Sequence, residues 1–546
     1  MKSHATPAAW LLLVLSAVSA VAKADTAAYT PTLPAFHVTL VGHAALYGRG
    51  MNAALAVYDH YVYIGSRTDG SSICVAATGV PSHEGCMHPH PGILIVDAKD
   101  PSHPHVVGEI GRPEAGVVGM TTRELRVWPH QKLLMVMRFH CSPVLHACEK
   151  GTDERFPFDI AFFDLSAPLM PRFISRYLPT SKAGHPVKPH EMFLWIDPEN
   201  GARALLYLST PSIETDAGTP NVVVADISRV RQTKTVTEVA EGNWNGLYPG
   251  THRPDYPYVA AKSQTCGPYD CNLYAHSMGV SVDGTRTYLA MEAGQFLVLN
   301  TERVAHDKTP GTVLSLNDDL ISSPLQRPVW GQSPADPSAV PATCKHTCAA
   351  GHSAIKVPGR KLVLTTDEVY GTYSHPSSGC PWGWARLIDV ADESHPKIVS
   401  EFQIEEDRQS FCDGYGKDAR LEQFTSFSSH NPTVLPHLAV TTWHSGGLQI
   451  EDISDAAKPV RAGWFSPVPL DHVATEDPAL GRGPSKVLFW SYPIIHDGLI
   501  YVVDVRNGLY ILRYSGPRAE ELRGVSFLEG NSNLGDAKRL ERMAVH

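Results

Sequence analysis

The sequence predicts an all-β fold, a seven-bladed β-propeller whose N-terminal strand completes the last blade. Three observations support this prediction. A sequence motif, here called a phrase, predicts two strands joined by an Asp-containing turn and recurs along the chain. A second phrase, which also predicts two strands, precedes most copies of the first. Glycine and proline, 43 residues each among 546, supply the frequent turns that many short strands require. Four antiparallel strands repeated around a ring are the pattern of propeller blades.

The first phrase is a β-branched strand that ends in Asp, then a polar turn, a Pro and another strand. It reads GILIVDAKDPSHPHVVGEIG at 92–111 and GGLQIEDISDAAKPVRAGWF at 446–465. Each copy predicts two strands joined by an Asx-type turn. Further copies lie at 158–178, at 221–240 (without the Pro), at 385–404 and, truncated, at 507–516.

The second phrase is an apolar strand, a turn and a further strand, as in IIHDGLIYVVDV at 494–505, where Asp497-Gly498 is a hairpin signal. Together the two phrases form seven units. The seventh unit lacks an outer strand, and AFHVTLVGHA at 35–44 resembles the outer strands of other units. Its pairing with the seventh unit would close the ring and cover the exposed strand edges. The units begin near residues 51, 121, 190, 276, 352, 430 and 491.

Both ends of the chain differ from the repeats. A short apolar run at 8–18 is followed by Ala22-Lys23-Ala24, which is typical of a signal-peptide cleavage site. The run is shorter than the roughly 20 residues of a membrane span. We therefore expect a periplasmic or secreted protein without a membrane span. The expected domains are a signal peptide at 1–24, the propeller at 25–516, and a surface helix or loose tail at 517–546.

Charge and cysteine content narrow the class of protein. The 46 Lys and Arg against 56 Asp and Glu give a net charge of −10, which argues against a nucleic-acid partner. The 10 cysteines favour disulfides between sequence neighbours in an oxidising compartment. The alternative is a thiolate metal site, for example at Cys344 and Cys348. The expected pairs are Cys74–Cys86, Cys141–Cys148, Cys266–Cys271, Cys344–Cys348 and Cys380–Cys412.

Four of the 27 histidines occupy the same place in the repeat, at the start of a unit. They are His190 in KPHEMFL, His276 in YAHSMGV, His352 in AGHSAIK and His430 in SSHNPTV. Since the first strand of each blade lines the central channel, we expect these side chains to converge on the axis as metal ligands. The alternative is an architectural role, in which each histidine bonds to the neighbouring blade.

A second layer of candidates follows the second strand of the units. From this layer we predict His444 and Glu292 as catalytic residues that move protons. Glu191, beside His190, is expected to point away from the axis, and His88 with His90 forms a further candidate metal pair. The second layer comprises Arg138, His140, Glu292, Asp367, Glu368, His444, Asp504 and Arg506.

The segments GILIVDAKDP, GGLQIEDISD and LIYVVDVRNGLYIL resemble those of the LVIVD-repeat family of β-propellers. The resemblance covers most of residues 35–515 and implies the fold, whereas the function of most members is unknown. More distantly, the exported, histidine-rich chain is similar to the selenium-binding protein/methanethiol oxidase enzymes. That similarity implies copper as the cofactor.

The function that these observations favour is an exported copper-dependent oxidoreductase acting on a small-molecule substrate at a His-lined channel. Imidazole ligands also suit zinc, which would support hydrolysis instead. A noncatalytic propeller that binds a protein or cell-surface ligand is the other alternative. The sequence specifies neither the substrate nor a protein partner.

Overall fold

The computed structural model describes residues 35–67, 74–76, 81–82, 90–111, 120–140, 158–210, 220–244, 265–266, 269–270, 275–291, 296–306, 312–322, 351–369, 382–408, 410–411, 426–476 and 486–543. The expected signal peptide, residues 1–24, lies outside these ranges. At least one cysteine of every expected disulfide pair also lies outside them.

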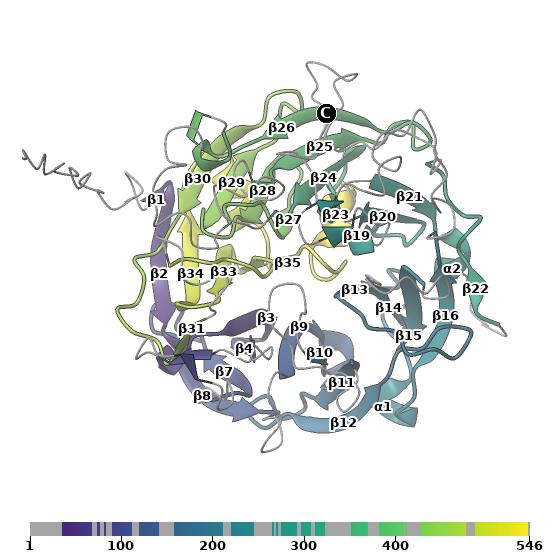
Figure 1. The fold of residues 1–546 in the computed structure, drawn as a ribbon, viewed down its shortest axis with the longest axis horizontal. Coiled ribbons are helices and arrows are strands. Elements are labelled where there is room, and N and C mark those ends of the chain that lie inside the picture. Colours follow the sequence, from purple (N-terminus) through teal and green to yellow (C-terminus); the bar gives the residue numbers. More distant parts are fainter. Residues whose placement is uncertain are drawn as a thin grey trace, which may run out of the picture.

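Seven antiparallel sheets surround a central axis, which confirms the predicted propeller (Figure 1). The first blade contains β3 (Asn52–Tyr58), β4 (Tyr61–Ser66), β7 (Ile93–Asp97) and β8 (His105–Ile110), and the second contains β9 (Met120–Trp128), β10 (Leu133–His140), β11 (Asp159–Asp164) and β12 (Arg172–Tyr177). The third contains β13 (Glu191–Ile196), β14 (Ala204–Ser209), β15 (Val222–Asp226) and β16 (Thr237–Gly242), and the described part of the fourth contains β19 (Ala275–Val280), β20 (Arg286–Met291) and β21 (Phe296–Asn300).

The remaining blades follow the same order. The fifth contains β23 (Gly351–Lys356), β24 (Leu362–Asp367), β25 (Ala385–Asp389) and β26 (Lys397–Phe402), and the sixth contains β27 (Pro432–Val434), β28 (Leu438–Thr442), β29 (Leu448–Asp452) and β30 (Val460–Phe465). The seventh contains β32 (Ile494–His496), β33 (Leu499–Asp504), β34 (Gly508–Tyr514) and β2 (Val38–Ala44).

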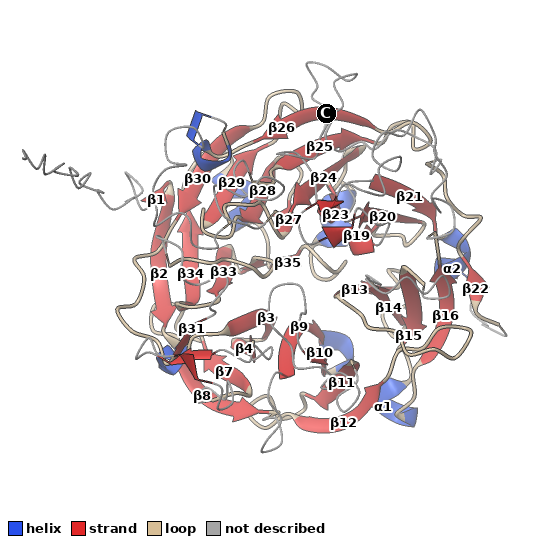
Figure 2. Ribbon diagram, in the orientation of Figure 1, coloured by secondary structure: helices blue, strands red, loops and turns tan. Residues whose placement is uncertain are grey.

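Shorter elements connect or extend the blades (Figure 2). None of the α-helices in the described part of the chain has the length and apolar character needed to cross a membrane. The helical elements are η1 (Leu46–Gly48), η2 (Pro129–Gln131), α1 (Val230–Thr233), α2 (Glu302–His306), η4 (Glu405–Asp407), α4 (Ala519–Arg523) and α5 (Ala537–Glu541). The short strands are β1 (Ala35–Phe36), β5 (Cys74–Ala76), β6 (Pro81–Ser82), β17 (Thr265–Cys266), β18 (Tyr269–Asp270), β22 (Leu314–Ser315), β31 (Thr475–Glu476) and β35 (Phe527–Glu529).

Asx-type turns recur where the third strand of a blade ends, as the repeat predicted. The carboxylate of Asp97 accepts a hydrogen bond from the backbone N–H of Lys99 at 2.8 Å. Asp452 accepts the N–H of Ser454 at 2.9 Å in the same way. Such a bond satisfies a backbone donor at the point where the chain leaves the sheet and turns into the outer strand.

Successive residues of a middle strand pack against different neighbouring blades. In β14, Leu205 and Tyr207 belong to an apolar cluster shared with the fourth blade. The intervening Leu206 and Leu208 belong to a cluster shared with the second blade. Because strand side chains alternate between the two faces, a sheet buried on both faces has nearly continuous apolar strands.

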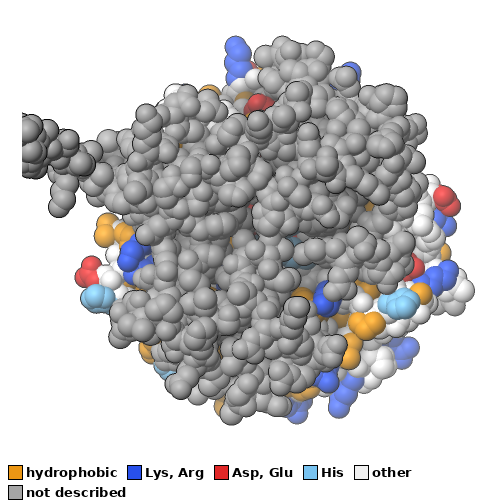
Figure 3. Space-filling model, in the orientation of Figure 1, with side chains coloured by type: hydrophobic (Ala, Val, Ile, Leu, Met, Phe, Trp, Pro, Cys, Tyr) orange, Lys and Arg blue, Asp and Glu red, His pale blue; other side chains and the backbone are white. Residues whose placement is uncertain are grey.

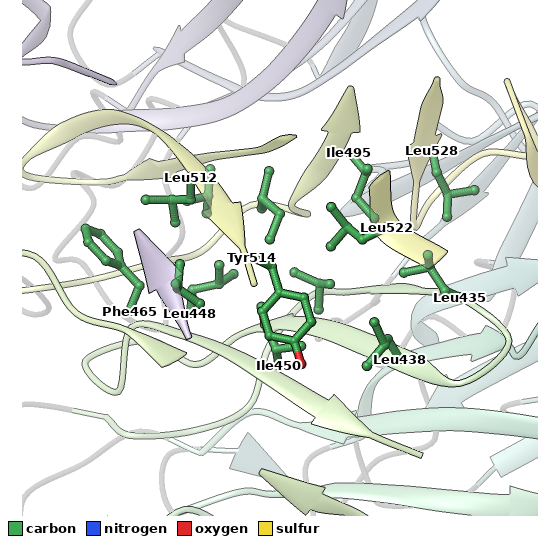
Figure 4. Close-up of a cluster of buried hydrophobic side chains, with 14 of the residues drawn as sticks. Leu435, Leu438, Leu448, Ile450, Phe465, Ile495, Leu512, Tyr514, Leu522 and Leu528 are labelled. Atoms are coloured by element: carbon green, nitrogen blue, oxygen red, sulfur yellow. The ribbon is translucent and has the colours of Figure 1, made fainter. Parts of the chain in front are cut away.

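Each pair of neighbouring blades encloses one buried apolar cluster among the described residues. Figure 4 shows the cluster between the sixth and seventh blades, where Ile450 and Leu512 are buried together. On the face seen in Figure 3, the described Lys, Arg, Asp and Glu side chains that are visible lie mainly at the periphery. The ring is therefore a series of interfaces rather than one central apolar core.

The predicted N-terminal closure is confirmed. β2 pairs antiparallel with β34, so the outer strand of the seventh blade comes from the start of the described chain. The preceding β1 pairs with β30 of the sixth blade. Gly42 of β2 also lies against the turn between β7 and β8, close to the Pro101 carbonyl oxygen. Closure thus joins the seventh blade to the first.

The C-terminal segment, expected as a surface helix or loose tail at 517–546, contributes a strand to the propeller. β35 pairs with β32 as the innermost strand of the seventh blade. The backbone N–H of Leu194 then donates to the carbonyl of Asn531 at 3.0 Å, across the channel from β32. This segment therefore lies over the later half of β13, and α4 and α5 flank it in sequence.

One buried carboxyl group lies inside the sixth blade. Glu451 accepts a hydrogen bond from the Thr441 hydroxyl at 3.0 Å through Oε2. Its Oε1 has no hydrogen-bond partner among the described residues. Burial raises the pKa of Glu451 to about 8.

We expect Gly42→Ala to lower the free energy of unfolding by about 1–3 kcal/mol, because a β-carbon at Gly42 would overlap the Pro101 carbonyl oxygen. Gly201→Ala is the matched control, since a β-carbon there meets nothing within 4 Å. The control should change stability by less than about 0.5 kcal/mol. Denaturant titration measures both. Equal stability of the two variants would contradict a tight contact between the seventh and first blades.

Glu451 should make the fold less stable as the pH rises. A glutamate in an unfolded chain has a pKa near 4.3, so the raised folded-state pKa favours the protonated, folded form. The stabilising contribution is complete below about pH 4 and is lost as the pH approaches 8. Between about pH 5 and pH 8.5, we expect the free energy of unfolding of wild type to fall by on the order of a few kcal/mol relative to that of Glu451→Gln. Denaturant titrations at the two pH values measure this, and parallel profiles would refute it.

Candidate metal centre

The predicted ligands lie where the inner strands begin, and two of them lie at local irregularities of the sheet. In β19 the register with β20 shifts between Ala275 and Ser277, and His276 is the extra residue. In β23 a similar shift includes His352. A β-bulge turns the extra side chain out of the regular alternation. This local geometry directs the imidazoles toward the propeller axis instead of a blade interface.

His190, His276, His352, His430 and His444 form one group, which we call the histidine cluster. Neighbouring rings lie in contact in this order, with centroid separations of 4.4, 4.1, 3.8 and 4.6 Å. The four predicted ligands are therefore brought together, as expected for matched positions in consecutive blades. His444, predicted as a catalytic residue, joins them from the turn after β28.

The carboxylate of Glu368, which follows β24, lies against four rings of the histidine cluster. Its Oε2 is 3.3 Å from Nε2 of His276 and 3.8 Å from Nε2 of His352. Its Oε1 is 3.0 Å from Nε2 of His430 and 3.6 Å from Nε2 of His444. The imidazoles and the carboxylate are the donor types of a transition-metal site.

Hydrogen bonds at Nδ1 fix the orientation of three of these rings. His430 donates from Nδ1 to the Trp490 carbonyl oxygen at 2.5 Å. His444 has Ser426 Oγ 2.9 Å from its Nδ1. Because the Ser426 hydroxyl donates to the Val369 carbonyl at 2.8 Å, its oxygen accepts the proton of His444.

The Nδ1 proton of His352 is also accepted by a serine hydroxyl that donates its own proton elsewhere. Its Nδ1 lies 2.8 Å from Ser353 Oγ, and that hydroxyl donates to Asn431 Oδ1 at 2.9 Å. With Nδ1 protonated, Nε2 carries the lone pair, and it has no hydrogen-bond partner among the described residues. A hydrogen bond at one ring nitrogen that orients the other toward a metal is the usual arrangement of histidine ligands.

The electrostatics of the cluster favour neutral rings beside an ionised carboxylate. Burial lowers the pKa of His352 and of His444 well below the ordinary value. Burial alone would raise the pKa of Glu368, but its electrostatic interactions with His430 and His352 and its hydrogen bonds with His276 and His430 hold that pKa well below its ordinary value. Neutral imidazoles and a carboxylate are the protonation states that bind metal ions.

His190 differs from the other four rings because Arg123 donates a hydrogen bond to its Nε2 at 2.8 Å. Its Nε2 also lies 3.0 Å from Nε2 of His276. Glu191, expected to point away, is instead buried within 3.4 Å of Arg123, and with His190 and His276 it forms a further group of possible metal ligands. Both neighbours therefore lie at the histidine cluster.

An aromatic ring covers one side of the cluster. Trp490 lies 4.9 Å from the His430 ring and 5.5 Å from the His444 ring, measured between centroids. The guanidinium of Arg67 lies 4.0 Å from the Trp490 ring centroid, and that of Arg123 lies 5.6 Å away. Positive charge and an aromatic face therefore adjoin the histidines.

A polar layer lies on the side of the cluster toward the C-terminal segment. The Tyr492 hydroxyl is 3.4 Å from both Ser277 and Ser353, which directly follow two of the histidines. Farther along the channel, Asn533 donates to the carbonyls of Ile196 and Val282. These contacts bind the C-terminal segment to the ends of β13 and β19 that lie away from the histidines.

The other candidates have different environments. Glu292, predicted as a catalytic residue, lies outside the described residues, as does His88. Arg138 pairs with Asp159 on β11, and Asp367 pairs with Arg386 on β25. The carboxylate of Asp504 accepts backbone N–H groups of the seventh blade, including that of Arg506. His90 pairs with Glu109 at 3.0 Å.

Arg123 and Trp490 are the neighbours of the cluster that the sequence analysis missed. A signal for Arg123 was present, because Arg123-Glu124 precedes an apolar strand ending in Trp128 just as His190-Glu191 precedes one ending in Trp195. Arg123 thus occupies the histidine position of the second blade. No comparable repeat marks Trp490.

Comparison with known proteins establishes no family for the chain. No family model and no curated protein match it, so the LVIVD-repeat and selenium-binding resemblances stay predictions. Among solved structures, it is similar to a protein from Lactobacillus plantarum (11% identity, 79% of this chain and 86% of that chain, TM-score 0.39). It is also similar to Chaetomium thermophilum Sqt1 bound to the N-terminus of ribosomal protein L10 (11% identity, 86% of this chain and 89% of that chain, TM-score 0.40). A third similar structure is the β-propeller domain of Myceliophteria thermophila Cps50 (Swd1) (9% identity, 85% of this chain and 96% of that chain, TM-score 0.39).

The backbone at His444 is in the left-handed region, with φ of 36°, which is unfavourable for every residue with a β-carbon. We expect His444→Gly to be more stable than His444→Ala by about 1 kcal/mol, because glycine removes the strain. At His352, whose φ is not positive, glycine should instead be less stable than alanine by a similar amount. Thermal denaturation of the four metal-free variants measures both differences. A stability difference between the glycine and alanine variants that has the same sign at both positions would contradict backbone strain at His444.

Proposed function

We propose that this chain is a metal-dependent oxidoreductase that binds copper at the histidine cluster and acts on a small molecule in the channel. One observation carries the proposal. The Nε2 atoms of four buried histidines lie 3.0 to 3.8 Å from the two oxygens of the Glu368 carboxylate. Purely architectural histidines would not require their second nitrogens to converge on a buried acid.

The donor set fits a transition metal, with copper among those that imidazole ligands suit. Metal–nitrogen bonds of about 2.0–2.1 Å in a tetrahedral arrangement place neighbouring donor atoms about 3.4 Å apart, close to the separations around Glu368. Imidazole-rich sites suit copper, zinc, nickel or iron, whereas calcium and magnesium prefer oxygen donors. The buried Nε2 of His352, which lacks a hydrogen-bond partner among the described residues, would be satisfied by a metal ion.

Copper, when bound, would supply one-electron redox chemistry. The protein would supply the binding environment for the substrate. Arg67 and Arg123 place positive charge beside Trp490, which favours a small anion with an apolar or aromatic body, such as a thiolate or phenolate. Buried surroundings would strengthen that attraction.

His444 serves as a metal ligand in this proposal, although a role in proton transfer was expected from the sequence. Its Nδ1 proton is committed to Ser426, whose own proton is committed to the Val369 carbonyl. That chain of hydrogen bonds holds the ring with Nε2 toward Glu368. A fixed ring with an available lone pair is suited to ligation.

Metal analysis of protein purified without an affinity tag tests the proposal. We expect stoichiometric copper in wild type and a lower copper content, or an at least tenfold lower overall affinity, in His276→Ala plus His352→Ala. The matched control is His103→Ala plus His395→Ala, which removes two exposed histidines bonded to Asp100 and Asp392 and should leave copper content unchanged. Oxygen consumption with thiols and phenols then measures activity.

Each alternative gives a different result. Folded wild type that takes up no copper refutes the proposal. Preferential binding of zinc, with hydrolysis but no oxygen consumption, identifies the zinc-dependent hydrolase instead. Copper that is bound equally by both double variants would place the metal outside the histidine cluster.

A further inference from the structure

Glu368 presents its two oxygens to two different pairs of histidines. Oε2 faces the Nε2 atoms of His276 and His352. Oε1 faces the Nε2 atoms of His430 and His444. Each pair forms, with the shared carboxylate, a separate group of possible metal ligands whose donor atoms all lie within 4.8 Å of one another.

A single ion cannot reach both pairs as the side chains stand. Ligand atoms on one ion are separated by at most twice the bond length, about 4.2 Å for nitrogen and oxygen ligands. Among the described residues, no group within a 4.8 Å limit contains both histidine pairs. The donors are therefore divided between two positions, and the carboxylate belongs to both.

The hydrogen bonds behind the rings preserve this division. On the His276–His352 side, the ring of His352 is fixed through Ser353, which accepts its Nδ1 proton. The other side is fixed through the Trp490 carbonyl at His430 and through Ser426 at His444. Because these partners come from different parts of the fold, the two pairs cannot rotate together onto one ion without breaking several buried hydrogen bonds.

We propose that the histidine cluster holds two metal ions bridged by the Glu368 carboxylate. His276 and His352 bind one ion through Nε2, and His430 and His444 bind the other. The inference rests on one part of the proposed function, namely that metal binds at the histidine cluster. In two-metal sites the ions lie about 3.5–4 Å apart, a spacing that one carboxylate spans with its two oxygens.

His190 stands apart from both pairs. Its Nε2 accepts a hydrogen bond from Arg123 and lies beside His276, so it approaches only one of the two positions. The structure therefore gives the two ions different surroundings. The ion on the His276 side lies near the guanidinium of Arg123, which is bonded to His190. The ion on the His444 side lies near the Trp490 ring.

Copper(II) reconstitution of the full chain tests the bridge by stoichiometry and electron paramagnetic resonance. We expect about two ions per chain in wild type, with an integrated spin signal much smaller than the copper content because a bridge couples the two spins. His276→Ala plus His352→Ala, and separately His430→Ala plus His444→Ala, should each retain one ion. Each should also regain a full signal from isolated copper.

The wild-type measurement is decisive even where a double variant does not fold. One ion per chain with a full spin signal overturns the bridged pair while leaving copper binding at the cluster intact. Two ions with the full signal of uncoupled copper show that Glu368 does not bridge. No bound copper overturns the proposed function and, with it, this inference. Glu368→Gln, which keeps the shape but weakens the bridge, should restore part of the uncoupled signal.

Discussion

The burial of both faces of every blade is the constraint on which the structure depends. Alternate side chains of β14 enter two different apolar clusters, so each blade needs a neighbour on either side. An open row would leave two apolar faces in water, whereas a closed ring leaves none. Closure also defines an axis, and the axis brings the starts of the inner strands together. Burial of apolar surface, rather than any attraction between imidazoles, thus assembles the histidine cluster.

The same rings combine an architectural and a chemical task. His430 donates to the Trp490 carbonyl next to the seventh blade, which is the kind of inter-blade bond that a purely structural histidine would make. Its other nitrogen nevertheless faces Glu368 at 3.0 Å. Buried polar groups are costly unless they are paired. The scaffold pairs the Nδ1 atoms of His352, His430 and His444 and places their Nε2 atoms around one carboxylate. The two interpretations of the repeated histidine are therefore compatible.

Repetition made most of the fold and part of the site predictable from the sequence. Matched phrases gave the seven blades, the Asx turns and the N-terminal closure, and the matched slot gave His190, His276, His352 and His430. Features outside the repeat were harder to predict. Glu368 was only one of eight candidates after the second strands, because nothing in its local sequence distinguishes it from Asp367, which pairs with Arg386. The charged composition after residue 516 obscured β35, whose place is set by its pairing with β32 and by hydrogen bonds between the residues that follow it and β13.

The seventh blade has strands from both ends of the described chain. β2 forms its outer edge and β35 its inner edge, although nearly 500 residues separate them. During synthesis the first six blades emerge before β32, β33, β34 and β35 exist, so the ring remains open until these four strands have been made. A truncated chain would expose the unpaired β2 and an apolar flank of the first blade. Synthesis of β35 is consequently the event that completes the seventh blade on the side of the channel.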